Sequence, residues 1–90
     1  VRIQVPVGVS YNADLHLVEE LMLQSAKAVP RVLATPAPAV WLHEFGDNSV
    51  NFIIQCWIMD PEEGVGNVRS EVLKKVWRAF QENGIEIPFP

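Results

Sequence analysis

The segment SVNFIIQCWIM, residues 49–59, decides the fold because it is apolar on both of its faces. In a strand, one face would carry the alternate residues Val50, Phe52, Ile54, Cys56 and Ile58. The other face would carry Asn51, Ile53, Gln55, Trp57 and Met59. A strand that is largely apolar on both faces is typical of the centre of a sheet. We therefore expect this segment to be the central strand.

Two further strands are expected before it. The run AVWLHEF, residues 39–45, is separated from the central strand by Gly, Asp, Asn and Ser, which is a hairpin signal. The segment VRIQVPVGV, residues 1–9, alternates strictly between apolar and polar or small residues, which predicts a half-buried strand. Pro6 indicates that part of one edge of this strand is unpaired or bulged.

A first amphipathic helix is expected after the turn-rich stretch SYNAD, in which Asn12 and Asp14 are candidate caps. Its apolar stripe has helical spacing over roughly fourteen to sixteen residues. Pro30 ends or kinks it. The stripe consists of Leu15, Val18, Leu21, Met22 and Ser25.

A second helix is expected after the loop DPEEGVG, residues 60–66, with Asn67 as its candidate cap. At its end, Gly84 is expected in the left-handed conformation of a Schellman motif, with Ile85 packed on Phe80. The buried stripe of this helix consists of Val68, Val72, Leu73, Val76 and Phe80.

These elements predict one α+β domain spanning residues 1–90, a ferredoxin-like β-α-β-β-α sandwich. We expect a mixed sheet with both helices on one face. The apolar run GIEIPFP, residues 84–90, stands where a fourth strand would begin in such a fold. Its alternating prolines resist ordinary strand pairing, so the run indicates the start of a structure outside these residues.

Composition excludes several classes of protein. Seven basic residues stand against eleven acidic ones, and the net charge of −4 argues against a surface for nucleic acid or anionic membrane. The single cysteine, Cys56, excludes an internal disulfide and a cysteine-based zinc cluster, and fits a small core residue. No apolar stretch reaches the ~20 residues that span a bilayer. Because the first residue is Val1 rather than Met, we expect a piece of a longer chain.

A single helix layer leaves the other face of the sheet uncovered. If Val40 and Leu42 face the helices, then Trp41, His43 and Phe45 face away, on the same side as Ile53 and Trp57. Such a patch measures on the order of several hundred Å², while soluble monomers seldom expose more than ~300–600 Å². We expect a preceding domain or another subunit to cover it. The alternative is that the chain's own loops half-shield the two tryptophans.

The residues offer little machinery for catalysis. His16 and His43 stand on different elements and have no partner at metal-ligand spacing. The acidic loop of Asp60, Glu62 and Glu63 lacks the alternating oxygen ligands of a calcium loop. The turn GVSYNAD, residues 8–14, has too few glycines and no basic residue for a phosphate cradle. The sequence therefore predicts no enzyme, no cofactor and no metal site.

Three stretches together resemble the C-terminal α/β domain of small-conductance mechanosensitive channels, the MscS family. VPVGVSYNADLHLVEELM is similar to the start of that domain, and PAPAVWLHEFGDNSVNFIIQCWI to its hairpin. VRSEVLKKVWRAFQENGIEIPFP is similar to its last helix and exit. The GIEIPFP ending, placed after a helix, is the most specific of these features.

The resemblance implies a non-enzymatic role in a homo-heptameric channel of the cell's inner membrane. Each chain would contain a pore helix, then a preceding β-domain, then this domain on the cytoplasmic side. Seven copies would enclose a vestibule through which ions and small osmolytes reach the pore during osmotic downshock. The segment after GIEIPFP would continue into an axial β-barrel.

Two sets of residues follow as hypotheses. An interface would be formed by Trp41, Ile53, Trp57, Pro88 and Phe89. The lining of the cage would carry Glu44, Asp60, Glu62 and Glu63, for which ordinary solubility charge is the other interpretation. The alternative function is a ferredoxin-like regulatory module that binds a small molecule, for which GVSYNAD is the candidate pocket.

Overall fold

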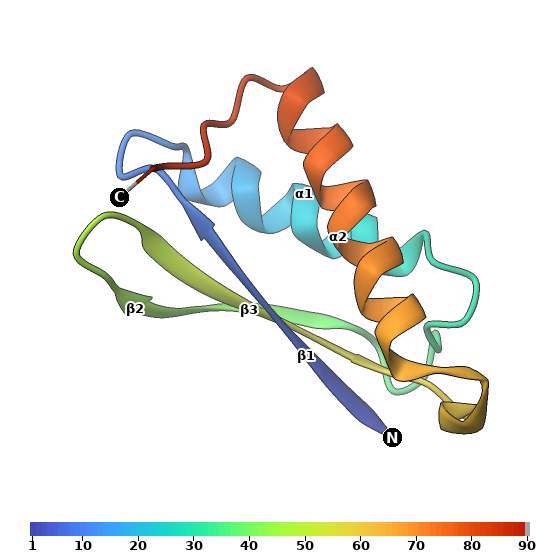
Figure 1. The fold of residues 1–90 in the computed structure, drawn as a ribbon. Coiled ribbons are helices and arrows are strands. Elements are labelled where there is room, and N and C mark those ends of the chain that lie inside the picture. Colours follow the sequence, from blue (N-terminus) through green and yellow to red (C-terminus); the bar gives the residue numbers. More distant parts are fainter. Residues whose placement is uncertain (90) are drawn as a thin grey trace.

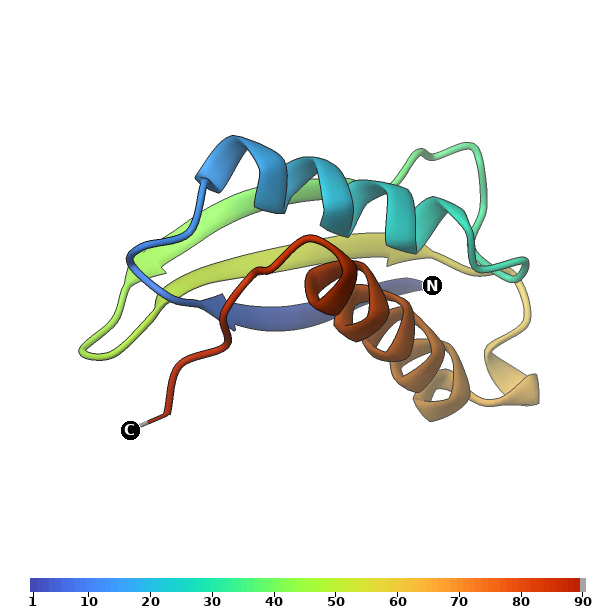
Figure 2. The same ribbon diagram turned by 90° about the horizontal axis from the view of Figure 1, so that it is seen from above.

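The computed structural model describes residues 1–89 and confirms an α+β arrangement of three strands and two helices (Figure 1). In chain order the elements are β1 (Arg2–Val9), α1 (Leu15–Lys27), β2 (Ala39–Phe45), β3 (Val50–Trp57), a 3-10 turn (Pro61–Glu63) and α2 (Val65–Glu82). Both helices lie on one face of the sheet (Figures 1 and 2). None of the described helices combines the length and the hydropathy that crossing a bilayer requires.

The sheet has the order β1-β3-β2, so the segment 49–59, which contains β3, provides the central strand as expected. Both neighbours of β3 run antiparallel to it. The expectation of a mixed sheet was therefore wrong. β1 and β2 do run in the same direction, but β3 lies between them and takes the hydrogen bonds of both, so no parallel pair forms. This is the ferredoxin-like order without a fourth strand in the described residues.

The core lies between the sheet and the helices. The face of β3 that was expected to be buried carries Val50, Phe52, Ile54 and Cys56, each no more than 2% exposed. Val18 and Met22 of α1 and Val72 and Phe80 of α2 cover it, and all four are fully buried. Every buried side-chain nitrogen and oxygen atom within residues 1–89 has a hydrogen-bond partner.

The caps of the helices follow local chemistry. Asp14 is the N-cap of α1 and accepts a hydrogen bond from the Leu17 amide at 3.2 Å, as expected of a cap. Asn67 does not cap α2, because the helix begins two residues earlier, at Val65, after the 3-10 turn and Gly64.

The end of α2 is the Schellman motif that the sequence predicts. Gly84 has φ of 66°, and the Ile85 amide donates to the Phe80 carbonyl at 2.9 Å. Ile85 is 8% exposed and packs in the same core as Phe80. The motif therefore sets the direction in which the tail leaves the helix.

Candidate interaction surfaces

The face of the sheet away from the helices carries Trp41 and Ile53 as direct cross-strand neighbours. Pro6 lies opposite Ile53 on the other side, so the three side chains form one apolar row. Trp41 is 37% exposed and Ile53 is half-buried. Residues paired directly across strands share a face and lie ~4.5–5.5 Å apart at Cβ, so this row is continuous.

Trp57 shares this face but is not part of that row. It lies opposite Arg2, four residues along β3 from Ile53, or roughly 13 Å at the usual rise of a strand. The row between them holds the two glutamines Gln4 and Gln55 and, on the β2 side, the small residue Ala39. The open face thus contains two separate aromatic positions rather than the contiguous patch that the sequence suggested.

A bulge in β2 changes which residues reach the open face. Leu42 pairs with Phe52 and Glu44 with Asn51, so His43 has no partner of its own in β3. One extra residue inverts the alternation beyond it. Phe45 is therefore paired with Val50, on the helix side of the sheet, and not on the open face where strict alternation placed it.

Phe45 stacks on Tyr11, with ring centroids 6.5 Å apart and an interplanar angle of 22°. The Tyr11 hydroxyl donates a hydrogen bond to the Gly46 carbonyl. In the same turn, the Ser10 hydroxyl accepts from the Asn12 amide at 3.1 Å. The Tyr11 hydroxyl thus holds the turn against the hairpin, while the bond between Ser10 and Asn12 is internal to the turn, and neither supports a small-molecule pocket there.

Arg31 was missed by the sequence analysis and joins two loops. Its guanidinium forms a two-bond ion pair with the Asp60 carboxylate, at 2.9 and 3.0 Å. It also donates to the carbonyls of Asp60 and Gly64, both at 2.8 Å. No local pattern signals a pair separated by 29 residues. These four bonds fasten the loop after α1 to the loop before α2.

Electrostatics at this pair follow the hydrogen bonds. The bond from Arg31 holds the pKa of the Asp60 carboxyl below its usual value. The bond to Asp60 in turn raises the pKa of Arg31.

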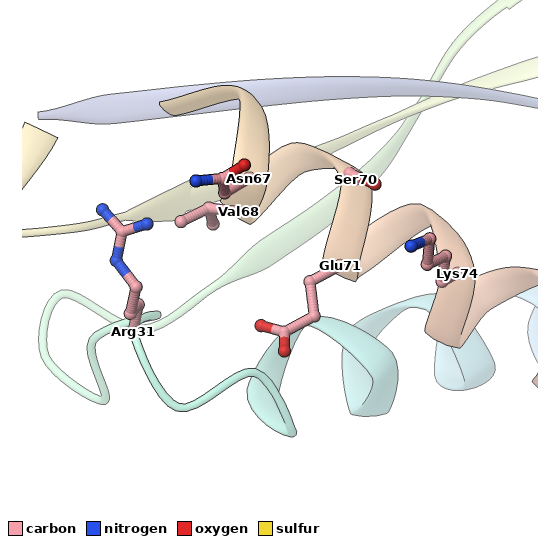
Figure 3. Close-up of a pocket in the computed structure, with 6 residues that line it drawn as sticks. All are labelled: Arg31, Asn67, Val68, Ser70, Glu71 and Lys74. Atoms are coloured by element: carbon pink, nitrogen blue, oxygen red, sulfur yellow. The ribbon is translucent and has the colours of Figure 1, made fainter. Parts of the chain in front are cut away.

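Figure 3 shows the guanidinium pointing toward the first turn of α2, beside Asn67 and Val68, in a depression of about 500 Å³. Because protein acceptors already engage the guanidinium, the depression has no free arginine with which to bind an anion.

The four acidic residues proposed to line a cage do not form one cluster. Glu44 lies at the hairpin end of the sheet, where it accepts a hydrogen bond from Asn51 at 3.2 Å. Asp60, Glu62 and Glu63 follow β3 at its opposite end, and only the two glutamates are exposed. Within residues 1–89, no three His, Cys, Asp or Glu side chains are grouped closely enough to hold a metal ion.

Cys56 lies in the core, as its position in the central strand predicts, and is fully buried. Burial raises the pKa of its thiol, an effect that Arg69 partly opposes. His16 and His43 are both exposed and stand on α1 and β2. The structure therefore does not bring the three side chains together.

The tail makes one backbone hydrogen bond just beyond the end of β1. Val1 and Ile58 exchange both backbone hydrogen bonds, at 2.8 and 3.0 Å. In an antiparallel pair such positions alternate, so the even-numbered residues of β1 direct their backbone polar groups to the free edge, where Pro6 offers a carbonyl but no amide. Ser10 continues this parity, and its amide donates to the Glu86 carbonyl at 3.0 Å.

Proline disfavours a fourth strand at the free edge of β1. The next hydrogen-bonded position of such a ladder would set residue 88 opposite Gly8, and residue 88 is a proline with no amide to donate. The described tail forms no strand, and its backbone bond at this edge is the one that Glu86 accepts from Ser10. Phe89 at its end is 91% exposed, while Pro88 is half-buried. Figure 2 shows the tail leaving the sheet.

Comparison with known proteins identifies the family. The profile described as "Mechanosensitive ion channel MscS, C-terminal" matches residues 3–87. An uncharacterized MscS family protein of Archaeoglobus fulgidus is 35% identical over 89 residues, which are 99% of this chain and 31% of that protein. A small-conductance mechanosensitive channel of Helicobacter pylori is 33% identical over 88 residues, 98% of this chain and 32% of the channel.

The fold agrees with the same assignment. The crystal structure of H. pylori MscS in its closed state superposes with a TM-score of 0.89, at 32% identity, over 99% of this chain and 35% of that one. A cryo-EM structure of Arabidopsis thaliana MSL1 has the same fold, with a TM-score of 0.73. The chain spans about a third of the length of the relatives it matches. It belongs to the MscS family of mechanosensitive ion channels and corresponds to the family's C-terminal domain.

Proposed function

We propose that this domain helps to enclose the cytoplasmic vestibule of an MscS-like channel, where it supports assembly and admits solutes to the pore during osmotic downshock. The parent protein would be a homo-heptamer in the cell's inner membrane. The domain would follow a preceding β-domain of the same chain, on the cytoplasmic side. Similarity to the H. pylori channel along the whole of this chain supports the proposal.

The observation that carries the proposal is the uncovered face of the sheet. Trp41 and Ile53 lie side by side there, and no element of the described chain covers them. Trp57 is half-buried on the same face beside Arg2. A tryptophan side chain buries ~150–250 Å² when it is fully covered, and Trp41, at 37% exposed, would add the remaining third or so of that area to an interface. The preceding β-domain or a neighbouring subunit would supply that cover.

The tail is the second proposed contact. Pro88 keeps it out of the sheet, and Phe89 projects a fully apolar ring into solvent. In the assembled channel the tails of neighbouring copies would meet beyond Phe89. Covering this ring would remove one of the most exposed apolar side chains of the described chain from water.

Assembly of the full-length channel tests the proposal. Changing Trp41→Glu places a carboxylate where the proposed interface requires an apolar surface. Truncating a hot-spot residue of an interface, a class enriched in tryptophan, costs ~2 kcal/mol or more, or about thirtyfold in affinity. We expect fewer intact oligomers on native gels and poorer survival of downshock by cells that depend on the channel. His43→Glu is the matched control, because His43 is exposed at the bulge of the same strand.

Retention of both assembly and survival by Trp41→Glu would overturn the role proposed for the open face. A parent protein that is monomeric in the membrane, or that gives no tension-gated current in patches, would overturn the proposed function as a whole.

Selectivity is a separate part of the proposal. A ring of copies would repeat the carboxylates of Glu62 and Glu63, and such a ring concentrates cations at low ionic strength. Asp60 would contribute less because its charge is paired with Arg31. Glu44 would line a different level of the cage. We expect Glu62→Lys with Glu63→Lys to lower the preference for cations, measured as a reversal potential in dilute salt. An unchanged reversal potential would leave these residues as ordinary solubility charge.

A further inference from the structure

The two free edges of the sheet carry depressions of opposite charge. At the β1 edge, a depression of about 500 Å³ lies beside α2. Its floor is apolar, and Leu73 and Trp77 are 41% and 56% exposed. Arg69 and Lys74 are its only charged residues. The remaining lining residues are Val7, Gly66, Ser70, Val76 and Ile87.

The β2 edge has a smaller depression of about 280 Å³ beside α1. Glu19 and Glu20 are its charged residues, and neither lysine nor arginine lines it. Leu23 and Val40 supply apolar surface, and both are half-buried. The other lining residues are His16, Pro38 and Ala39.

The charged residues of the two depressions form no ion pair within residues 1–89, where the salt bridge present joins Arg31 to Asp60. They are Arg69 and Lys74 at one edge and Glu19 and Glu20 at the other. The strand order puts β1 and β2 at opposite edges of the sheet. Figure 2 shows α1 and α2 on the two sides of the helix layer above them. The basic and acidic surfaces therefore face outward in opposite directions.

We propose that the α2–β1 edge of one copy docks on the α1–β2 edge of the next copy. Arg69 and Lys74 would face Glu19 and Glu20 across the contact, and Leu73 and Trp77 would pack toward Leu23 and Val40. The occupant is a second copy because one chain carries both complementary halves. The contact joins two different surfaces, so it is head-to-tail and closes into a ring when the rotation permits.

This inference rests on the self-association in the proposed function and adds the surfaces that perform it. It predicts a weaker contact at high salt, because charges at a solvent-exposed rim are screened beyond ~8 Å at physiological ionic strength. It also explains why a chain of net charge −4 keeps a basic patch on α2. That patch would be covered in the assembly.

Cysteine cross-linking in the full-length channel tests the contact directly. Glu20→Cys and Lys74→Cys place one thiol on each edge, while the native Cys56 is fully buried and contributes no background. Under mild oxidation, the chain with both changes should give a ladder of linked species on a denaturing gel. Each single change should give none, because a head-to-tail contact never brings two identical positions together.

Charge exchange supplies the second arm. Glu19→Lys with Glu20→Lys should lower the association constant roughly tenfold, because like charges then meet across the contact. Adding Arg69→Glu and Lys74→Glu to the same chain should restore it. The matched controls are Arg78→Glu and Glu82→Lys, whose side chains line the hollow between the two helices and not an edge.

The edge contact would be overturned if an assembled channel gave no ladder of linked species, or if the single changes gave the same ladder as the double change. Either result would leave the proposed function standing. Failure of the fourfold exchange to restore association would also overturn it. A parent protein that does not associate at all would instead refute the proposed function.

Discussion

Replacing each of two glycines by alanine tests how the tail leaves α2. Gly84 has φ of 66°, and a Cβ built on it meets no atom within 4 Å. The cost of Gly84→Ala is therefore the left-handed backbone alone, ~1–2 kcal/mol for a residue with a Cβ. Gly66 lies in the first turn of α2, and its Cβ likewise meets nothing within 4 Å. Gly66→Ala should stabilise by ~0.4–1 kcal/mol, because alanine restricts the unfolded chain.

The two variants carry the same chemical change, one in the first turn of α2 and one just past its end, and should move stability in opposite directions. Urea unfolding of the domain, followed by circular dichroism, measures both against the unmodified chain. With a slope of ~1–1.5 kcal/mol per molar urea, Gly84→Ala should lower the midpoint by about 1 M. Gly66→Ala should raise it by roughly half a molar. If Gly84→Ala leaves the midpoint unchanged or raises it, the tail does not leave through a left-handed residue, and its direction has another cause.

Three further results are expected. Asp14→Ala should cost about 1 kcal/mol in thermal or urea unfolding by removing the cap of α1, whereas Asp14→Asn should cost much less; equal losses would contradict capping. The pKa of Asp60 is lowered in the folded state, so its pairing with Arg31 stabilises above about pH 4 and the stability is lost as pH falls through the folded pKa. Asp60→Asn should therefore be less stable than the unmodified chain at pH 6, and the difference in free energy of unfolding should shrink in acid. A difference that grows toward pH 3 would contradict this pH dependence. The Cys56 thiol should react with a water-soluble disulfide reagent only as fast as the domain opens, because it is fully buried with a raised pKa; rapid labelling in native buffer would show that the central strand is accessible.

Short-range patterns determined which elements form and where the helices end. The two-faced apolar segment is the central strand, with β1 and β2 bonded to its two edges, while the helices cover one of its faces. Gly84 and Ile85 end α2 as expected because a Schellman motif depends on residues within six positions of one another. Membership of the MscS family was also expected from the sequence, through a resemblance of residues rather than through any physical pattern, and the family profile confirms it.

The tertiary structure alone decided how these elements meet. Strand order made every pair antiparallel, and the extra residue at His43 turned Phe45 away from the open face. Two features depend on register between distant segments: the pairing of Arg31 with Asp60, and the separation of Trp57 from Trp41 by a row that contains two glutamines. Such features arise because a strand's alternation fixes which residues share a face, while the packing of the whole chain selects the partner strand and the offset. The opposite charges of the two edges become visible only once that order places β1 and β2 on opposite sides.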